Sequence, residues 1–177
     1  MQNEKIALLS IKPIFANSIF NGEKKFEFRK AGINPDVKLI LVYASSPVRA
    51  FIGFIEIDEV ITASPDLLWK KTGKEGAISR NLFFSYFEGK ELGYAIKIKS
   101  ICKFETSINP KELLEDFHPP QSFMYVNGNV VKKLAKKFSA DDEISFRWWC
   151  SRSRQNDLLQ VTRSKDWLRA CLSEPVD

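Results

Sequence analysis

A short stretch near the N-terminus, GEKKFEFR at positions 22–29, carries charged side chains at a spacing that could do chemistry. Lys24, Lys25 and Arg29 lie close to Glu27 along the chain, so cations and a carboxylate come together. Such a set can donate to a phosphate or a base carbonyl and accept from an amino group. A lysine acts as a nucleophile or base where burial or a neighbouring cation lowers its pKa. The alternative interpretation is an ion-paired strand that contributes little stability.

The elements expected around this stretch place its charges at the start of a strand. Residues 5–12 predict a first strand. Residues 13–21 predict a helix, because apolar side chains recur there at i,i+4 spacing. Phe26 and Phe28 predict a second strand, with both rings on one face. Lys24 shares that face by parity. We therefore expect Lys24 at the mouth of a barrel or before the regular strand.

Short strands outnumber helices in the rest of the sequence. The apolar run over 37–43 is nearly continuous, as is typical of a strand buried on both faces. A further strand or a strand pair is predicted over 50–61 and another strand over 92–104. Helices are predicted over 66–73, 79–87, 110–114 and 130–138. Together these elements predict an α+β fold, a small and mostly antiparallel β-barrel with surrounding helices.

The composition changes after about residue 138, so we expect one domain over 1–138 and a C-terminal extension over 139–177. Most arginines and tryptophans of the chain lie in the extension, which predicts a strand over 144–149 and a helix over 165–172. The extension could pack back on the domain or form a surface for a protein partner. Both alternatives remain open.

The bulk composition predicts a cytoplasmic protein that leans toward anionic partners. The formal net charge is +5 and the pI is about 9.1. Three widely spaced cysteines and a single histidine, His118, do not make a zinc set, and we expect no metal and no cofactor. An odd, sparse cysteine count fits a reducing compartment. No apolar run reaches membrane length, so we expect no membrane association.

The charged stretch matches the signature GxKxxExR through Gly22, Lys24, Glu27 and Arg29. Three other segments support the match in order along the chain: LSIKP at 9–13, YASSPV at 43–48 and PPQSF at 119–123. With these motifs, which extend over roughly residues 5–126, the sequence resembles the ASCH domain family. After about residue 138 there is no such resemblance.

The resemblance implies a PUA-like fold and a ligand that is RNA or nucleotide-like, bound in a charged cleft beside the barrel. Members of the family include regulators, and the longer ones are labelled transcriptional regulators. The basic helix over 130–138 would steer the nucleic-acid backbone. The residues expected to line the cleft are Lys12, Lys24, Lys25, Glu27, Arg29, Ser45, Ser46, Gln121 and Ser122.

Other activities of the family remain as alternatives. Some members are metal-independent amidohydrolases that deacetylate acetylated cytidine, and by resemblance Lys24 and Glu27 would then be catalytic. Those members have a threonine where Glu27 stands, and Glu56, Glu59 and Glu75 are all candidates for their downstream glutamate. A ribonuclease and a protein-interaction module are further alternatives. A charged network that includes Glu27 favours recognition, because Glu27 holds Lys24 charged.

Overall fold

A computed structural model describes residues 6–126, 130, 133 and 134 of the chain. Within these residues six strands form one sheet: β1 (Ile6–Ile11), β2 (Phe26–Arg29), β3 (Leu39–Ala44), β4 (Ala50–Ala63), β5 (Gly93–Ile108) and β6 (Phe123–Val126). The helices are α1 (Pro13–Phe20), α2 (Pro65–Thr72) and α3 (Arg80–Tyr86), with short 3-10 turns η1 (Gly73–Glu75) and η2 (Pro110–Glu112).

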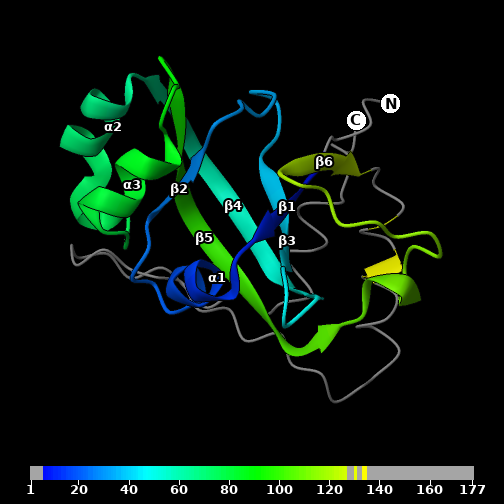
Figure 1. The fold of residues 1–177 in the computed structure, drawn as a ribbon. Helices are drawn as coiled ribbons and strands as arrows, with labels where there is room; N and C mark the ends of the chain where they lie inside the picture. The colour runs from blue at the N-terminus through cyan, green and yellow to red at the C-terminus, as the bar shows by residue number, and fades with distance from the viewer. Residues whose placement is uncertain (1–5, 127–129, 131–132, 135–177) are drawn as a thin grey trace, which may run out of the picture.

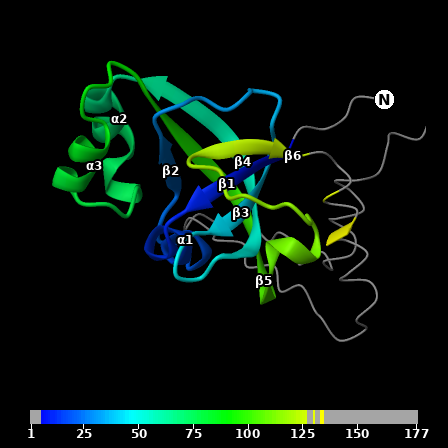
Figure 2. The same cartoon turned by 45° about the vertical axis from the view of Figure 1, so that its right-hand side comes forward.

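The sheet is mixed and mostly antiparallel, with the strand order β2-β5-β4-β3-β1-β6. Only the β1–β3 pair is parallel among the described strand pairs. The long strands β4 and β5 run diagonally through the molecule and change register at several bulges, and the sheet curls into a half-barrel (Figures 1 and 2). The predicted α+β barrel-like architecture is confirmed.

Strand β3 is buried on both faces, as its continuous apolar sequence predicts. Leu41 and Tyr43 belong to one core cluster, whereas Ile40 and Val42 belong to a second cluster on the other face. Alternate side chains of a strand point to opposite faces, so one strand contributes to two cores. Helix α1 covers the second of these cores through its buried residues.

Helices α2 and α3 form a separate lobe at the β2 end of the sheet (Figure 1). Phe26 and Phe28 of β2 pack in a third core with Leu68 of α2 and Phe83 of α3. The Phe28 and Phe83 rings meet edge to face, with their centroids 4.9 Å apart. The two phenylalanines of the charged stretch therefore anchor the helical lobe.

The connection from α1 to β2 places the charged stretch as the sequence predicts. Gly22 adopts φ 79°, a left-handed conformation that suits glycine after a helix end. Strand β2 begins only at Phe26, so Lys24 precedes the regular strand. This confirms one of the two positions expected for Lys24.

Most of the predicted helix over 130–138 and the whole C-terminal extension over 139–177 lie outside the described residues. Val130, Lys133 and Leu134 are helical, and Val130 and Leu134 are buried in the first core. The remainder of the helix predicted over 130–138, and the elements predicted over 144–149 and 165–172, are not described. In the described part of the chain, no helix is long and apolar enough to cross a membrane.

Candidate functional site

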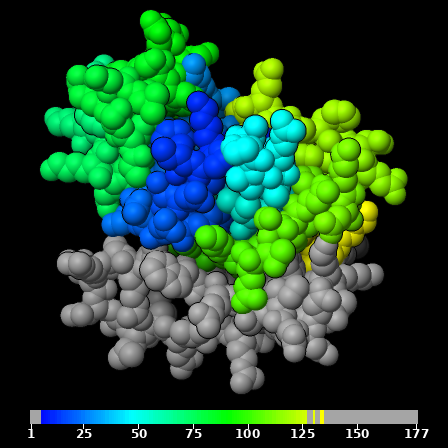
Figure 3. Space-filling model, turned by 60° about the horizontal axis from the view of Figure 1, so that its bottom comes forward, coloured from blue at the N-terminus to red at the C-terminus, as the bar shows by residue number. Residues whose placement is uncertain are grey.

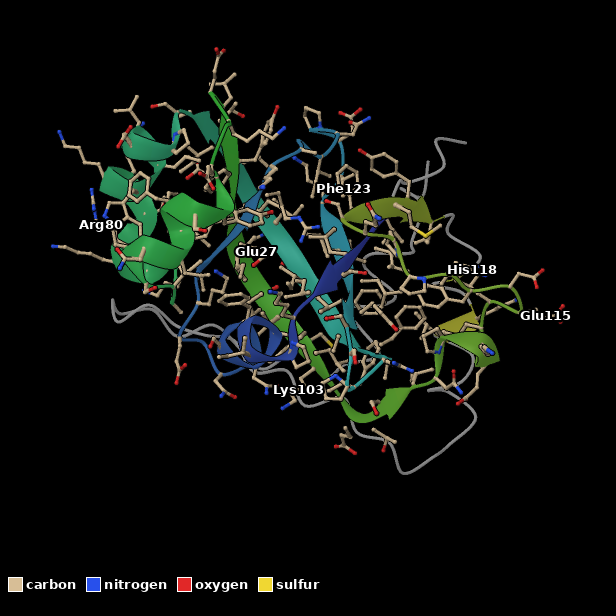
Figure 4. All side chains as sticks on the ribbon, in the orientation of Figure 1. Glu27, Arg80, Lys103, Glu115, His118 and Phe123 are labelled. Atoms are coloured by element: carbon tan, nitrogen blue, oxygen red, sulfur yellow. The ribbon has the colours of Figure 1, made fainter. Side chains whose placement is uncertain are left out.

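A cleft of about 710 Å³ opens beside the sheet, between α1, β2, α3 and the loop before β6. Its floor includes the charged stretch, and Glu27 lies near the centre of the molecule in Figure 4. The segment around residues 45–50 (cyan) lies against the beginning of α1 (blue) in Figure 3, and the Ser45 amide donates to the Ile11 carbonyl. The polar residues of the lining are Ser10, Lys12, Lys24, Glu27, Arg29, Lys30, Tyr43, Ser45, Tyr86, Gln121 and Ser122.

Most of the residues expected in the cleft do line it. The structure brings together Lys12, Lys24, Glu27, Arg29, Ser45, Gln121 and Ser122. Two do not belong to the lining. Lys25 turns to the surface and pairs with Glu75 at 2.6 Å, and Ser46 is exposed in the turn after β3. Successive residues of an extended chain point to opposite sides, so Lys24 and Lys25 cannot both face the cleft.

Lys24 is a buried cation, with only 3% of its surface exposed. Its Nζ donates to the Gly76 carbonyl at 2.6 Å and lies 3.7 Å from Glu27 Oε2. The Phe15 and Phe28 rings lie 5.2 and 4.7 Å from the same atom. Burial lowers the pKa of Lys24, and the Glu27 carboxylate opposes that shift.

Gly76 is the residue that lets the helical lobe reach Lys24. A Cβ at this position would lie 2.5 Å from the Phe28 ring, so a larger side chain would push the backbone away. The next residue, Ala77, has φ 46°, a left-handed conformation that is unfavourable for alanine. A strained turn thus presents the Gly76 carbonyl to Lys24.

Arg29 fastens the loop before β6 to the floor of the cleft. Its Nη1 donates to the Ser10 carbonyl at 3.3 Å, and its Nη2 donates to the carbonyl of Ser122 and to its hydroxyl at 2.8 Å. The Ser10 amide also donates to the Ser122 carbonyl. The Arg29 Nε and the Ser10 hydroxyl are buried without a hydrogen-bond partner among the described residues. Arg29 therefore holds two walls of the cleft in place.

Several residues that line the cleft were not predicted from the sequence. Leu82 and Tyr86 lie on one apolar stripe of α3, and such a stripe usually packs in a hydrophobic core. In this structure both residues line the cleft. Burial raises the pKa of Tyr86, and Lys30 Nζ lies 5.1 Å from the centroid of the Tyr86 ring. Lys30 directly follows Arg29, and its place at the end of the charged stretch is the signal that could have identified it.

The lining of the cleft carries an excess of positive charge. Lys12, Lys24, Arg29 and Lys30 face one carboxylate, Glu27, which leaves a formal charge of +3 from four cations and one anion. Lys12 and Lys30 are exposed, whereas the other three charged side chains are buried. Cations inside a concave surface focus the field on anionic ligands.

The remaining candidates for chemistry lie apart from the cleft. His118 is exposed on the loop that follows η2, well away from Glu27 (Figure 4), and its Nδ1 lies 3.0 Å from the Asp116 carbonyl. Across the described ranges, no three His, Cys, Asp or Glu side chains gather as metal ligands. Cys102 of β5 is buried in the first core, and burial raises its thiol pKa to about 12, so it is a poor nucleophile.

Comparison with known proteins finds relatives that match more than half of the chain. No family model matches the chain. The chain is 31% identical over 139 residues to an ASCH domain-containing ribonuclease from Zymomonas mobilis. The aligned region covers 75% of this chain and 91% of that relative. The chain is also 30% identical over 109 residues to a large ribosomal subunit protein uL22 from Ureaplasma parvum, across 61% of this chain and 34% of that relative.

Solved structures give the same likeness. The crystal structure of ASCH from Zymomonas mobilis matches with a TM-score of 0.70 and 31% identity, over 75% of this chain and 94% of that chain. The crystal structure of a serine-to-alanine mutant protein, also from Zymomonas mobilis, matches with a TM-score of 0.71 and 29% identity, over 77% and 99% of the two chains.

Proposed function

Because this chain belongs to the ASCH domain family, we propose that its cleft binds single-stranded RNA or a nucleotide, as a regulatory module. One observation carries the proposal: Lys24, Glu27 and Arg29 converge on a concave site whose lining bears an excess of three positive charges. The relative named as a ribonuclease adds support, because that name implies an RNA ligand for the relative. RNA as ligand and a free thiol at Cys102 both fit a protein of the cytoplasm.

The exposed cations of the cleft would take the phosphates. Lys12 and Lys30 stand at its rim, where a phosphate can bind without losing all of its water. Ser45 and Gln121 are polar rim residues that can complete the contacts. The unpaired base would then enter between aromatic side chains, since bases in single strands are free to stack on them.

Binding of a fluorescent single-stranded RNA, followed by anisotropy at low and moderate salt, tests this proposal. We expect Lys12→Ala with Lys30→Ala to weaken binding and to flatten the salt dependence, by about 0.7 in the slope of log K against log salt for each lost phosphate contact. Lys103→Ala is the matched control, because Lys103 is an exposed lysine of β5 that does not line the cleft. Binding that is absent at low salt, or equal in all three proteins, would contradict the proposal.

A second candidate function is RNA cleavage, and the name of the Zymomonas mobilis relative favours it. Lys24 is the candidate catalytic residue. Its buried ammonium would stabilise the charge that develops on a phosphate during cleavage, with Glu27 and the Gly76 carbonyl holding it in position. Gel analysis of labelled RNA after incubation with the protein tests this candidate. Incubation with acetylated cytidine, with deacetylation as the readout, separately tests the amidohydrolase alternative. Cleavage that persists unchanged in Lys24→Met would exclude Lys24 from the reaction.

A further inference from the structure

Glu27 is a buried carboxylate whose two oxygens make only long contacts with the residues that the structure describes. Oε1 lies 3.4 Å from Arg29 Nη1, and Oε2 lies 3.7 Å from Lys24 Nζ. Charge-assisted hydrogen bonds of this kind are usually about 2.7–2.9 Å long. Both cations make shorter bonds elsewhere, Lys24 to the Gly76 carbonyl at 2.6 Å and Arg29 to the Ser122 hydroxyl at 2.8 Å. Glu27 therefore keeps acceptor capacity that a ligand can use.

The position of Glu27 in the cleft suits its oxygens to accept hydrogen bonds from the base of a nucleotide rather than to face the phosphate. The exposed cations, Lys12 and Lys30, would bind the phosphate near the rim, whereas Glu27 lies deeper and its side chain is only 8% exposed. A planar base that enters from the rim presents its hydrogen-bonding edge to the floor. Phe15 and Tyr86 line the same cleft and offer rings for stacking.

We propose that Glu27 reads the base of the bound nucleotide and selects guanine. The inference rests on the proposed RNA-binding function of the same cleft. Guanine carries two neighbouring donors on its Watson–Crick edge, the N1–H and the N2 amino group, which match the two oxygens of a carboxylate. The O6 carbonyl beside N1 is an acceptor, and Lys24 Nζ, which lies on the Oε2 side of Glu27, is the donor that suits it.

Each of the other bases sets an acceptor against one oxygen of Glu27. In adenine and cytosine the amino group stands next to an unprotonated ring nitrogen, and in uracil a single N–H lies between two carbonyls. Two acceptors facing each other in a buried site repel and remain unpaired, and such a mismatch is strongly rejected. We expect guanine to be preferred by about tenfold, within the range measured for good bidentate contacts to bases.

Titration of the wild-type protein with the four nucleoside 5′-monophosphates, followed by calorimetry, tests the preference. The phosphate and the ribose are the same in all four, so a difference in affinity reports on the base. Inosine monophosphate then isolates the contact, because it lacks only the N2 amino group of guanine. Glu27→Gln replaces one carboxylate oxygen with a donor at nearly the same shape, and Glu75→Gln is the control at an exposed glutamate outside the cleft.

Guanosine monophosphate should bind about tenfold more tightly than the others, and inosine monophosphate should lose several-fold of that affinity. Glu27→Gln should lose the preference for guanine, because its amide sets a donor against one of the two guanine donors, while Glu75→Gln keeps the preference. The inosine comparison uses the wild-type protein, so it decides the matter even where Glu27→Gln is too unstable to purify.

Three results would overturn the inference in different ways. Four nucleotides that bind within twofold of one another would show that the cleft binds nucleotides without reading the base. A loss with deoxyguanosine monophosphate as large as the loss with a changed base would show that Glu27 accepts from the ribose hydroxyls. No binding of any nucleotide or RNA would overturn the proposed function as well.

Discussion

Replacing Arg29 with methionine should destabilise the fold far more than an ordinary ion pair would suggest. Arg29 is 6% exposed and donates to the carbonyls of Ser10 and Ser122 and to the Ser122 hydroxyl. Methionine fills a similar volume but leaves the buried acceptors and the Glu27 carboxylate without these donors. Hydrogen bonds to charged groups contribute about 1.5–3 kcal/mol each. Removing one member of a buried ion pair costs about 3–5 kcal/mol.

Because these contributions overlap, we expect Arg29→Met to lower the free energy of unfolding by about 3–5 kcal/mol. That is a large part of the roughly 5–15 kcal/mol of a typical domain. Arg29→Lys should cost less, because it keeps a charge beside Glu27 but loses the fork that bonds Ser122. Adding Glu27→Gln to Arg29→Met should cost less than the sum of the two changes, because the unpaired carboxylate is then absent.

Urea denaturation followed by tryptophan fluorescence measures these differences. Lys97→Met is the matched control. Lys97 pairs with Asp58 at 2.7 Å, but both side chains are more than 40% exposed, so its loss should cost less than about 1 kcal/mol. If Arg29→Met and Lys97→Met lower the stability equally, Arg29 does not hold the cleft walls together.

Three further predictions concern buried or strained groups. Burial lowers the pKa of Lys24 in the folded protein below 10.5, the value of the unfolded chain, so at a pH between these two pKa values the unfolded chain binds more protons. The free energy of unfolding of the wild type, relative to that of Lys24→Met, should therefore rise as the pH approaches 10.5. Urea titrations in which it falls would contradict this. Ala77→Gly should raise the free energy of unfolding by up to about 1 kcal/mol, because φ 46° is strained for alanine, whereas a lower urea midpoint would refute the strain. Burial raises the pKa of the Cys102 thiol to about 12. In a Cys150→Ser, Cys171→Ser background, Cys102 should therefore resist a thiol reagent at pH 8 until urea unfolds the protein. Rapid reaction in native buffer would show that the thiol is accessible.

Local sequence patterns were enough to predict most elements of the fold. The mainly apolar segment 5–12 and the nearly continuous apolar run over 37–43 correspond to β1 and β3, because a strand that is buried on both faces needs apolar side chains in succession. The strand or strand pair predicted over 50–61 is one strand, β4, which extends to Ala63. The sequence did not reveal that Phe26 and Phe28 belong to the core of the helical lobe, since a strand pattern does not say which partner covers its face.

The site was harder to predict, because its geometry depends on contacts between distant segments. Glu27 and Arg29 are neighbours in sequence, but the loop that Arg29 holds lies more than 90 residues further on. Lys24 is held by the backbone carbonyl of Gly76. Every residue has such a carbonyl, so the type of residue at position 76 does not reveal this contact. Tyr86 was not predicted as a site residue, because an apolar stripe on a helix does not show which of its members border a cleft.

A nuclear magnetic resonance titration of the isotope-labelled protein with a short single-stranded RNA most directly tests whether the cleft is the binding site. We expect the largest shifts at amides around Lys12, Ser45 and Gln121, whereas the amides near Lys103 stay in place. Shifts confined to surfaces outside the cleft, with the amides around Lys12 and Gln121 unmoved by saturating RNA, would contradict it.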